Sequence, residues 1–337
     1  MIFMNRSGER ASAARYHARV TAAPLYPDTP PWRSQQWPVG QGHALRVQEF
    51  GHADGIPALV LHGGPGSGCS PLLRRVFDPR RYRVICVDQR GAGHSTPGGA
   101  TRHNSTPDLL GDLRRLRLHL GLPGWLVVGG SWGATLALLH AADEPQAVAA
   151  LLLRSSFLAR AEDIDGFFQG AARLLPEAWQ AFAASAPEAH RGKLLGWLAQ
   201  VFRQGDAHSQ QAAAAAWWAW EQALCGTLAP LPQGAALQAL VDRYRVQSHY
   251  LQQGCFLEAP LLQRCAGVPP VPTLLLHADN DRVCRPEGAL ALHAQLPHAA
   301  LRWVSAAGHD AGHPAMVAAT VQALDGYAHS GRWQSAA

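Results

Sequence analysis

Short apolar runs that alternate with helix-like segments constrain the fold of this chain more than any other feature. The runs ALVLH, YRVICVD, WLVVGG and VAALLLRSS occupy residues 58–62, 82–88, 125–130 and 148–156. Between the second and third runs, leucines recur at helical spacing from Asp108 to Leu120. Buried strands that alternate with helices are typical of a parallel sheet covered on both faces. The pattern therefore predicts an α/β fold with a mostly parallel central sheet.

The strand pattern stops after residue 156 and returns near residue 271. Residues 157–264 carry Trp, Ala and Gln at helical spacing, which predicts a helical cap domain inserted into the sheet domain. VPTLLLHAD and LRWVSAAG then restore the strand signal, and a last helix begins near Pro314. We expect a core made of residues 36–156 and 265–337. Residues 1–35 are interpreted as an N-terminal extension that is partly disordered.

The stretch GGSWG, residues 129–133, places a serine between glycines where a strand becomes a helix. It fits G-x-S-x-G in the strand, turn and helix context that this motif requires. There the serine is held in an unfavourable backbone conformation, and the positive end of the helix dipole faces it. Ser131 is therefore a candidate nucleophile. A tight turn with no chemical role is the alternative, and only partners elsewhere in the chain decide between them.

Such partners follow later strands. A serine hydroxyl needs a base, and the base needs a carboxylate that orients it. In this architecture they come in the order Ser, Asp, His, each after a strand. Asp279 and Asp281 follow TLLLH, and His309 follows LRWVSAAG. Because Asp279 is nearer the strand end and suits a turn, we predict a triad of Ser131, Asp281 and His309.

The glycine-rich loop LHGGPGSG, residues 61–68, supplies the remaining part of a serine hydrolase site. The tetrahedral intermediate carries an oxyanion, which needs two backbone N–H donors. Trp132, directly after the nucleophile, offers one donor. We expect Gly64 to offer the other, with Gly63 as the second choice.

Three competing interpretations of these motifs fail on chemistry. GGPGSGCS has the spacing of a phosphate-binding loop, but Cys69 occupies the lysine position and Pro65 lacks an N–H. DQRGAGHS has no third glycine at the offset of a dinucleotide signature. HDAGH spaces two histidines like a zinc protease but lacks the glutamate base and contains Gly312. We therefore expect neither an organic cofactor nor a metal.

Composition disfavours several other classes of protein. Only 16% of the residues are charged, the net charge is +5, and the arginines are scattered, so we expect no nucleic-acid binding. No run is long and apolar enough to span a membrane, and the first residues lack the apolar segment of a secretory signal. The six cysteines form no CxxC pair, which favours a reducing compartment, and we expect a cytoplasmic protein. A homo-oligomer is left open.

Taken together, the motifs resemble those of the proline iminopeptidases, prolyl aminopeptidases of the α/β-hydrolase fold. The stretches that carry the resemblance are LVLHGGPGSG, VICVDQRGAGHSTP, VVGGSWGATLAL, LLLRSSF, WWAWE, HADNDRVC and SAAGHD. They come in the order of the family and cover most of residues 25–325. The resemblance implies release of an N-terminal residue, typically proline, from a peptide or small amide with a free N-terminus.

The resemblance also implies a site for the substrate ammonium in the cap. The family uses a glutamate in a W-x-x-W-E context, which corresponds to Glu221, with Trp220 beside it. Members typically carry a second glutamate in a stretch like R-I-E-N-H-Y. Here Gln247 stands in its place, and it accepts a hydrogen bond but offsets no charge. Arg154 and Phe157 match positions of the family near the substrate pocket.

The leading expectation is a serine aminopeptidase that releases an N-terminal residue, preferably proline, through an acyl-enzyme. Two alternatives remain open at this stage. The first is an amidase or esterase with the same triad and another substrate, for which Gln247 is the clue. The second is a binding protein on a hydrolase scaffold, which the complete set of acid and base partners disfavours.

Overall fold

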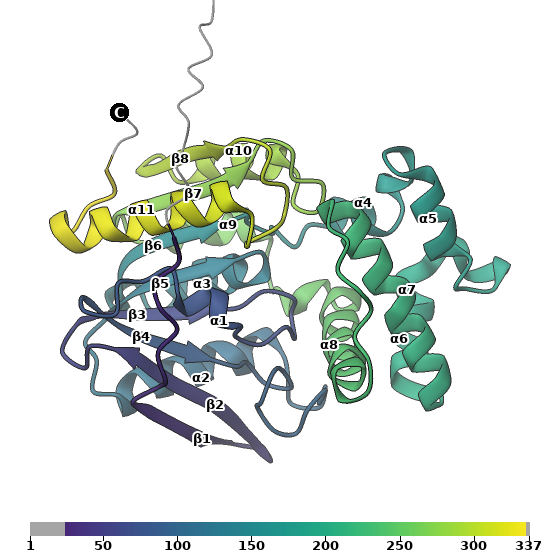
Figure 1. The fold of residues 1–337 in the computed structure, drawn as a ribbon, viewed down its shortest axis with the longest axis horizontal. Coiled ribbons are helices and arrows are strands. Elements are labelled where there is room, and N and C mark those ends of the chain that lie inside the picture. The colour runs from purple at the N-terminus through teal and green to yellow at the C-terminus, as the bar shows by residue number, and fades with distance from the viewer. Residues whose placement is uncertain (1–23, 335–337) are drawn as a thin grey trace, which may run out of the picture.

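A computed structural model of the chain describes residues 24–334. Most of the predicted N-terminal extension, residues 1–35, lies outside this range. Within it, eight strands form one sheet in the order β1-β2-β4-β3-β5-β6-β7-β8 (Figure 1). The strands are β1 (Arg33–Gly40), β2 (His43–Gly51), β3 (Ile56–Leu61), β4 (Tyr82–Val87), β5 (Trp125–Gly130), β6 (Val148–Arg154), β7 (Thr273–Ala278) and β8 (Ala299–Val304).

The sheet is parallel from β4 to β8, and only β1 and β2 run antiparallel to their neighbours. This confirms the predicted α/β fold with a mostly parallel sheet. The two antiparallel strands were not among the predicted elements. They lie at one edge, and β1 is mainly exposed, so they lack the continuous apolar run that marks the inner strands. β1 also begins at Arg33, before the predicted start of the core.

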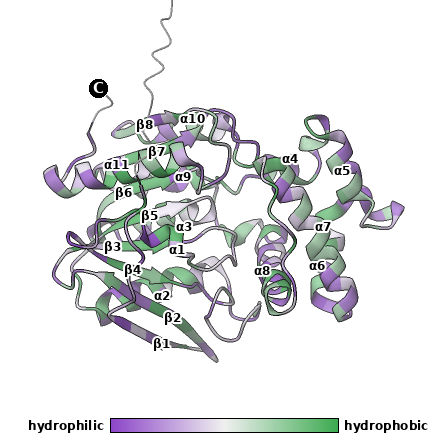
Figure 2. Cartoon of the chain, viewed as in Figure 1, coloured by the Kyte–Doolittle hydropathy of each residue, from purple (hydrophilic) through white to green (hydrophobic). Residues whose placement is uncertain are grey.

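Helices cover both faces of the sheet because alternate residues of each inner strand point to opposite sides. Leu59 and Leu61 face one cluster of buried apolar side chains, and Ala58 and Val60 face the other. The inner strands lie at the hydrophobic end of the colour scale in Figure 2. The first cluster includes residues of α2 (Thr106–His119), α3 (Trp132–Asp143), α9 (Leu261–Arg264) and α10 (Pro286–Gln295). The second includes residues of α11 (Pro314–Ser330), with α1 (Pro71–Arg74) packed against it.

Every longer element between β6 and β7 is a helix, and these helices stand to the right of the sheet in Figure 1. They are α4 (Ala161–Phe168), α5 (Pro176–Ala183), α6 (Leu194–Gln204), α7 (Ala207–Cys225) and α8 (Ala235–Gln252). Short 3-10 turns are η1 (Pro145–Ala147), η2 (Gly170–Arg173), η3 (Glu188–Lys193), η4 (Gly254–Phe256) and η5 (Cys265–Gly267). The arrangement agrees with a helical insertion, although the domain boundaries at 156/157 and 264/265 stay a prediction. We call α4 to α8 the cap helices.

Helix α7 shows how the sequence sets the bounds of a cap helix. Asp206 precedes its first turn, and the carboxylate accepts a hydrogen bond from the N–H of Ser209 at 2.8 Å. The helix ends at Gly226, whose φ of 70° suits a residue without a side chain. Between these ends, Trp217 is fully buried and stacks on Tyr244 of α8 with ring centroids 4.7 Å apart. This stacking joins the two helices that carry the predicted ammonium site.

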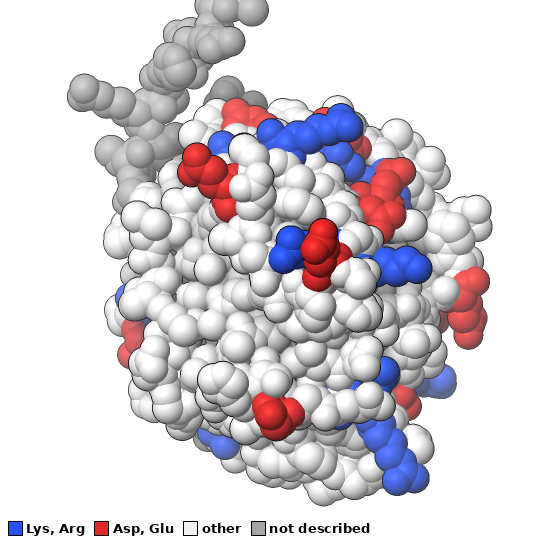
Figure 3. All heavy atoms as spheres, turned by 90° about the vertical axis from the view of Figure 1, so that its right-hand side faces the viewer, with Lys and Arg blue, Asp and Glu red and all other residues white. Residues whose placement is uncertain are grey.

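Charged side chains of both signs occur on the face that the cap helices form. Figure 3 shows the face on which the cap helices lie, where positive and negative side chains are interspersed without a continuous basic stripe. Nucleic-acid binding domains typically cluster Lys and Arg on one face. Among residues 24–334, no helix has the length and hydropathy needed to cross a membrane.

Candidate active site

Ser131 lies at the sharp turn between β5 and α3, as the motif predicts. Its backbone has φ 55° and ψ −123°, a strained conformation for a residue with a side chain. The flanking glycines are needed for close packing. A Cβ on Gly129 would lie 2.3 Å from the carbonyl oxygen of Gly133, and one on Gly133 would lie 2.1 Å from that of Leu61. The turn therefore holds the serine at the carboxyl end of the sheet.

His309 and Asp281 meet in the loops after β8 and β7. The Nδ1 atom of His309 lies 2.8 Å from the Oδ2 atom of Asp281. The other carboxylate oxygen, Oδ1, accepts hydrogen bonds from the N–H groups of Val283 and Cys284, both at 2.9 Å. Asp279 instead accepts from the N–H of Ala306 at 2.9 Å. Asp281 is thus placed to orient the imidazole, while Asp279 ties together two loops.

The electrostatics of this pair suit a base and its orienting carboxylate. Burial disfavours the charged form of each group, but the attraction between them outweighs it. As a result, the pKa of His309 is raised above its ordinary value, and the pKa of Asp281 is lowered. No hydrogen bond joins Ser131 Oγ to His309 in the described chain, although both side chains line one cavity. Catalytic hydrogen bonds are often long before substrate binds.

The loop of residues 62–68 lies directly beside the serine. A Cβ on Gly63 would lie 3.4 Å from the Cβ of Ser131, and both Gly63 and Gly64 line the cavity. Within residues 24–334, no hydrogen bond occupies the N–H of Gly64 or of Trp132. These two amides are therefore available as the predicted oxyanion donors.

Gln89 holds this loop against the serine turn, a role that motif analysis missed. Its side-chain N–H donates to the carbonyl of His62 at 3.0 Å, and its side-chain oxygen accepts from the indole of Trp132 at 2.9 Å. The N–H of Gln89 donates to Nε2 of His62 at 3.0 Å. Nδ1 of His62 therefore carries the proton and donates to the carbonyl of Gly63 at 2.9 Å. The only sequence signal is the DQRG stretch, which follows β4.

The loop also contacts the cap backbone. Gly66 has φ 94°, and a Cβ there would lie 2.8 Å from the carbonyl oxygen of Arg243 and 3.1 Å from the Cβ of Val246. Helix α8 therefore packs against the loop with no room for a side chain between them.

A cavity of about 480 Å³ lies between the triad and the cap helices. It is lined by Ser131 and His309 from the core, and by Glu221, Arg243 and Gln247 from α7 and α8. Its apolar wall includes Phe157, Ile164, Phe167, Phe168, Trp218, Leu251 and Val283. Of the predicted substrate-binding residues, Glu221, Gln247 and Phe157 therefore reach the same space as the nucleophile.

Glu221 is already paired in this structure. Its Oε2 atom accepts a hydrogen bond from Nη2 of Arg243 at 2.8 Å and from the hydroxyl of Tyr244 at 3.0 Å. The guanidinium of Arg243 keeps its charge, because the attraction of Glu221 outweighs the effect of burial and raises its pKa. The resemblance anticipated the carboxylate but not the arginine beside it.

Two predicted contacts are not supported by the positions of their residues. Trp220 is buried among the cap helices, where its indole donates to the carbonyl of Phe167 at 3.1 Å and stacks on Phe182. It does not line the cavity, whereas Trp218 does. Residues two apart on a helix point to different sides. Trp218 therefore reaches the cavity and Trp220 does not, and the role of Trp220 as a substrate contact stays a prediction.

Arg154 lies beneath the site rather than in it. It ends β6, is buried, and does not line the cavity. Its Nη1 atom is 3.5 Å from the carbonyl oxygen of Ala311, two residues after His309. Burial lowers its pKa to about 10. Its position suits support of the loop that carries His309, and the predicted substrate contact is therefore not supported.

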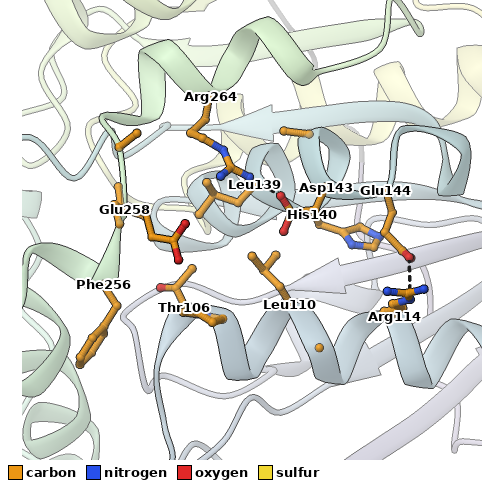
Figure 4. A pocket seen from close by; sticks show the side chains of 15 residues that line it. Thr106, Leu110, Arg114, Leu139, His140, Asp143, Glu144, Phe256, Glu258 and Arg264 are labelled. Atoms are coloured by element: carbon orange, nitrogen blue, oxygen red, sulfur yellow. Dashed lines mark hydrogen bonds and ion pairs between the residues drawn. The ribbon is translucent and has the colours of Figure 1, made fainter.

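A second cavity, of about 550 Å³, lies at the other end of α3 (Figure 4). Helix α3 begins next to Ser131 and ends at Asp143, so its two ends are about 18 Å apart. The side chains in this cavity include ion pairs of Arg114 with Glu144 and of Arg264 with Asp143. None of the triad residues lines it. The first cavity is therefore the candidate active site.

No cluster of three or more His, Cys, Asp or Glu side chains suited to a metal ion occurs within residues 24–334. The two histidines of HDAGH, His309 and His313, have other partners. His309 pairs with Asp281. His313 directly precedes α11 and its Nδ1 atom accepts a hydrogen bond from the N–H of Ala315.

Comparison with known proteins agrees with this geometry. The model of a family described as alpha/beta hydrolase fold matches residues 57–314. A proline iminopeptidase of Xanthomonas citri is 37% identical over 90% of this chain and 99% of its own length. A proline iminopeptidase of Arabidopsis thaliana is 38% identical over 90% of this chain and 82% of its own length.

Solved structures agree at the level of the fold. VinJ superposes with a TM-score of 0.62 at 19% identity, over 89% of this chain and 99% of that one. A proline iminopeptidase of Mycobacterium smegmatis superposes with a TM-score of 0.57 at 20% identity, over 89% of this chain and all of that one. The two sequence relatives share far more identity than these structures do. The chain therefore belongs to the proline iminopeptidases of the alpha/beta hydrolase fold.

Proposed function

We propose that this chain is a serine aminopeptidase that releases an N-terminal residue, preferably proline, from a peptide or small amide. One observation carries the proposal. The hydrogen-bonded pair of His309 and Asp281 opens onto the cavity that Ser131 and Glu221 also line. A base, a nucleophile and an anionic group for an ammonium thus share one enclosed space. The names of the sequence relatives support the preference for proline.

Acylation uses the residues in fixed roles. The α-ammonium of the substrate binds Glu221, which places the first carbonyl carbon beside Ser131. His309 takes the hydroxyl proton as Oγ attacks, and the N–H groups of Gly64 and Trp132 stabilise the oxyanion. The imidazolium then gives its proton to the leaving amine, the C–N bond breaks, and an acyl-enzyme forms.

Deacylation repeats these steps with water. His309 takes a proton from the water molecule, whose oxygen attacks the acyl carbon. The intermediate collapses, the proton returns to Ser131, and the free amino acid leaves. Asp281 stabilises the charged imidazole in both halves of the reaction.

A panel of aminoacyl-naphthylamides tests the proposal. Prolyl-naphthylamide is expected to be hydrolysed with the highest kcat/KM of the neutral residues, and the N-acetylated form is expected to be inert. The reason is that acetylation removes the charge that binds Glu221. Ser131→Ala should lower turnover by more than a thousandfold while the far-UV circular dichroism spectrum stays unchanged.

Two results would contradict the proposal. If N-acetyl-prolyl-naphthylamide reacted as fast as the free-amine substrate, the chain would not be an aminopeptidase. If Ser131→Ala kept more than about a tenth of the activity, the mechanism would not depend on this serine.

A second candidate function is an amidase or esterase that does not require a free amine. The pairing of Glu221 with Arg243 at 2.8 Å favours it, because the carboxylate already has a counter-ion. The substitution of Gln247 for a second carboxylate favours it as well. The acetylated substrate in the same panel separates this candidate from the aminopeptidase.

We also propose a cytoplasmic location, with a peptide as the partner and no membrane or nucleic-acid partner. All six cysteines are free thiols in the described residues, which suits a reducing compartment. Cell fractionation followed by the naphthylamide assay tests the location. Recovery of the activity in a secreted fraction would contradict it. Size-exclusion chromatography with light scattering decides whether the chain forms a homo-oligomer.

A further inference from the structure

Arg243 gives the amine end of the cavity a cationic group that the aminopeptidase reaction does not need. An isolated ammonium calls for carboxylates around it, and a nearby like charge opposes its binding. Here the guanidinium of Arg243 touches Glu221, the carboxylate expected to bind that ammonium. The charge of Glu221 is therefore offset before substrate arrives.

Glu221 and Arg243 each have a hydrogen-bonding atom without a partner in the described chain. Arg243 and Tyr244 bond to the Oε2 atom of Glu221, and within residues 24–334 no hydrogen bond occupies Oε1. Arg243 uses only Nη2 in its described hydrogen bonds, so Nη1 is without a partner there, whereas Nε is buried and also unpaired. About 24% of its side chain is exposed, and it lines the cavity. The pair thus offers an acceptor and a charged donor side by side.

Among the described residues that line the cavity, the surroundings add the carboxylates of Asp163 and Asp310 and no second arginine or lysine. The cavity volume of about 480 Å³ falls in the range of pockets for drug-sized ligands. Its wall is largely aromatic and aliphatic. In such a setting the attraction of opposite charges is stronger than in water. Gln247, one helical turn after Arg243, lines the same space and adds no charge.

We propose that Arg243 is a specificity determinant that selects N-terminal residues bearing a side-chain carboxylate, glutamate and aspartate, beside the neutral residues expected for the family. The ammonium of such a residue binds Glu221, and its carboxylate binds Arg243. In an acidic residue these two groups are separated by a few bonds, which matches two protein charges in direct contact. The inference rests on the proposed aminopeptidase function and extends its substrate class.

The test compares two substrates that differ only in charge, glutamyl-naphthylamide and glutaminyl-naphthylamide. The measured quantity is the ratio of their kcat/KM values, with glutamyl in the numerator. The wild-type enzyme should give a ratio above one. Arg243→Met should lower the ratio at least tenfold, which corresponds to about 1.4 kcal/mol. The lone carboxylate of Glu221 then repels the acidic side chain.

Two further variants control for charge and for folding. Arg245→Met removes the same charge from the same helix, but Arg245 pairs with Asp242 and Gln210 outside the cavity, so the ratio should stay within about threefold of wild type. Arg243→Lys keeps the charge and should keep the ratio above one. The ratio is insensitive to partial misfolding, because both substrates are measured on the same enzyme sample.

The outcomes separate this inference from the proposed function. If Arg243→Met leaves the ratio within threefold of the wild-type value, or if the wild-type ratio is below one, Arg243 does not select acidic residues. That result leaves prolyl-naphthylamide hydrolysis untouched as evidence for the aminopeptidase. If the wild-type enzyme releases no N-terminal residue from any free-amine substrate, the proposed function fails first, and the inference that rests on it fails too.

Discussion

The core and the cap helices build their halves of the site by different physical means. In the core, Ser131 sits on a turn whose shape is set by its neighbours, because a side chain on Gly129 or Gly133 would collide with backbone. In the cap, Glu221 gets its position from packing and pairing with residues of another helix, Arg243 and Tyr244. Local sequence therefore positions the predicted nucleophile, whereas contacts between helices position the predicted ammonium site.

The two halves also differ in how charge is arranged. The core pair of Asp281 and His309 is held by backbone N–H groups as well as by its own hydrogen bond. The cap pair of Glu221 and Arg243 lines the cavity, and each residue has a hydrogen-bonding atom that a ligand can use. The first pair is suited to the proton transfers of the proposed mechanism, and the second is suited to discrimination between substrates. The predictions below probe each half in turn.

The largest expected effect is in the core. Asp281→Asn should lower kcat by about ten-thousandfold, because the imidazole loses its orienting carboxylate. The same substitution should also shift the pH at which kcat/KM falls on the acidic side of its pH profile. The raised pKa of His309 means that wild-type activity is lost as pH falls through a value above the ordinary one. Without the carboxylate, burial is the main effect and lowers the pKa of His309. The acidic limb of the kcat/KM profile of the variant therefore shifts to lower pH.

The measurement is kcat/KM on prolyl-naphthylamide from about pH 4.5 to 8.5, about two units on either side of the pKa of an unperturbed imidazole. An acidic limb that stays in place in the Asp281→Asn enzyme would mean that His309 does not control it. Asp279→Asn is the matched control. Its carboxylate bonds to Ala306, and the limb should not move.

The next effect tests how strongly the cap depends on packing. Trp217 is fully buried and contacts Tyr244, Phe167, Phe168 and Phe202. Trp217→Ala should lower the free energy of unfolding by about 3–5 kcal/mol, because a large cavity is left behind. Chemical denaturation followed by circular dichroism measures the change. The exposed Trp32 provides a control, where the same substitution should cost under about 1 kcal/mol. Equal losses would remove the distinction between buried and exposed tryptophan.

Glu221→Gln should lower kcat/KM about a hundredfold on substrates with a free amine. The ammonium then enters a partly dehydrated cavity that holds Arg243 and has lost its counter-charge. A small ester without an amine, p-nitrophenyl acetate, should react nearly as well as with the wild-type enzyme, because the triad and oxyanion donors are unchanged. A parallel loss on both substrates would show that Glu221 supports the fold of the cap rather than the binding of the amine.

The smallest effect is expected from adding the missing carboxylate. Gln247→Glu should raise kcat/KM for prolyl-naphthylamide about tenfold, which is about 1.4 kcal/mol. A glutamate at this position lies one helical turn after Arg243 and can share its charge. Glu221 is then freer to bind the ammonium. A lower kcat/KM in this variant would mean that the cavity is no longer shaped for a second carboxylate.

Sequence patterns predicted the core well because its signals are local. Each triad residue directly follows an apolar run, and parallel strands place their carboxyl ends at one edge of the sheet. Ser131, Asp281 and His309 were therefore expected to lie together, and the structure puts Asp281 and His309 in contact. The fold class followed from the same runs. Strand β1 was missed because it is a mainly exposed edge strand, and β2 was missed because its buried residues alternate with partly exposed ones.

The cap could not be predicted to the same depth. The W-x-x-W-E resemblance located Glu221, but which tryptophan faces the substrate depends on how α7 is rotated against the other cap helices. Packing turns Trp218 to the cavity and Trp220 to Phe182. No sequence motif distinguishes Arg243 from the other scattered arginines. Only the packing of α8 against α7 brings it next to Glu221. Gln89 had no local signal either, because its partners His62 and Trp132 are distant in sequence and only the fold brings them together.

The contact between Gly66 and α8 limits how such enzymes can be re-engineered. Because the loop that carries the predicted oxyanion donor Gly64 touches the carbonyl of Arg243 with no space for a side chain, the cap cannot be exchanged independently of this loop. A chimera that receives a foreign cap must also receive a loop whose backbone fits the new helix. Transplanting specificity between relatives therefore calls for exchange of two distant stretches at once, and a cap grafted alone would disturb the chemistry it was meant to leave intact.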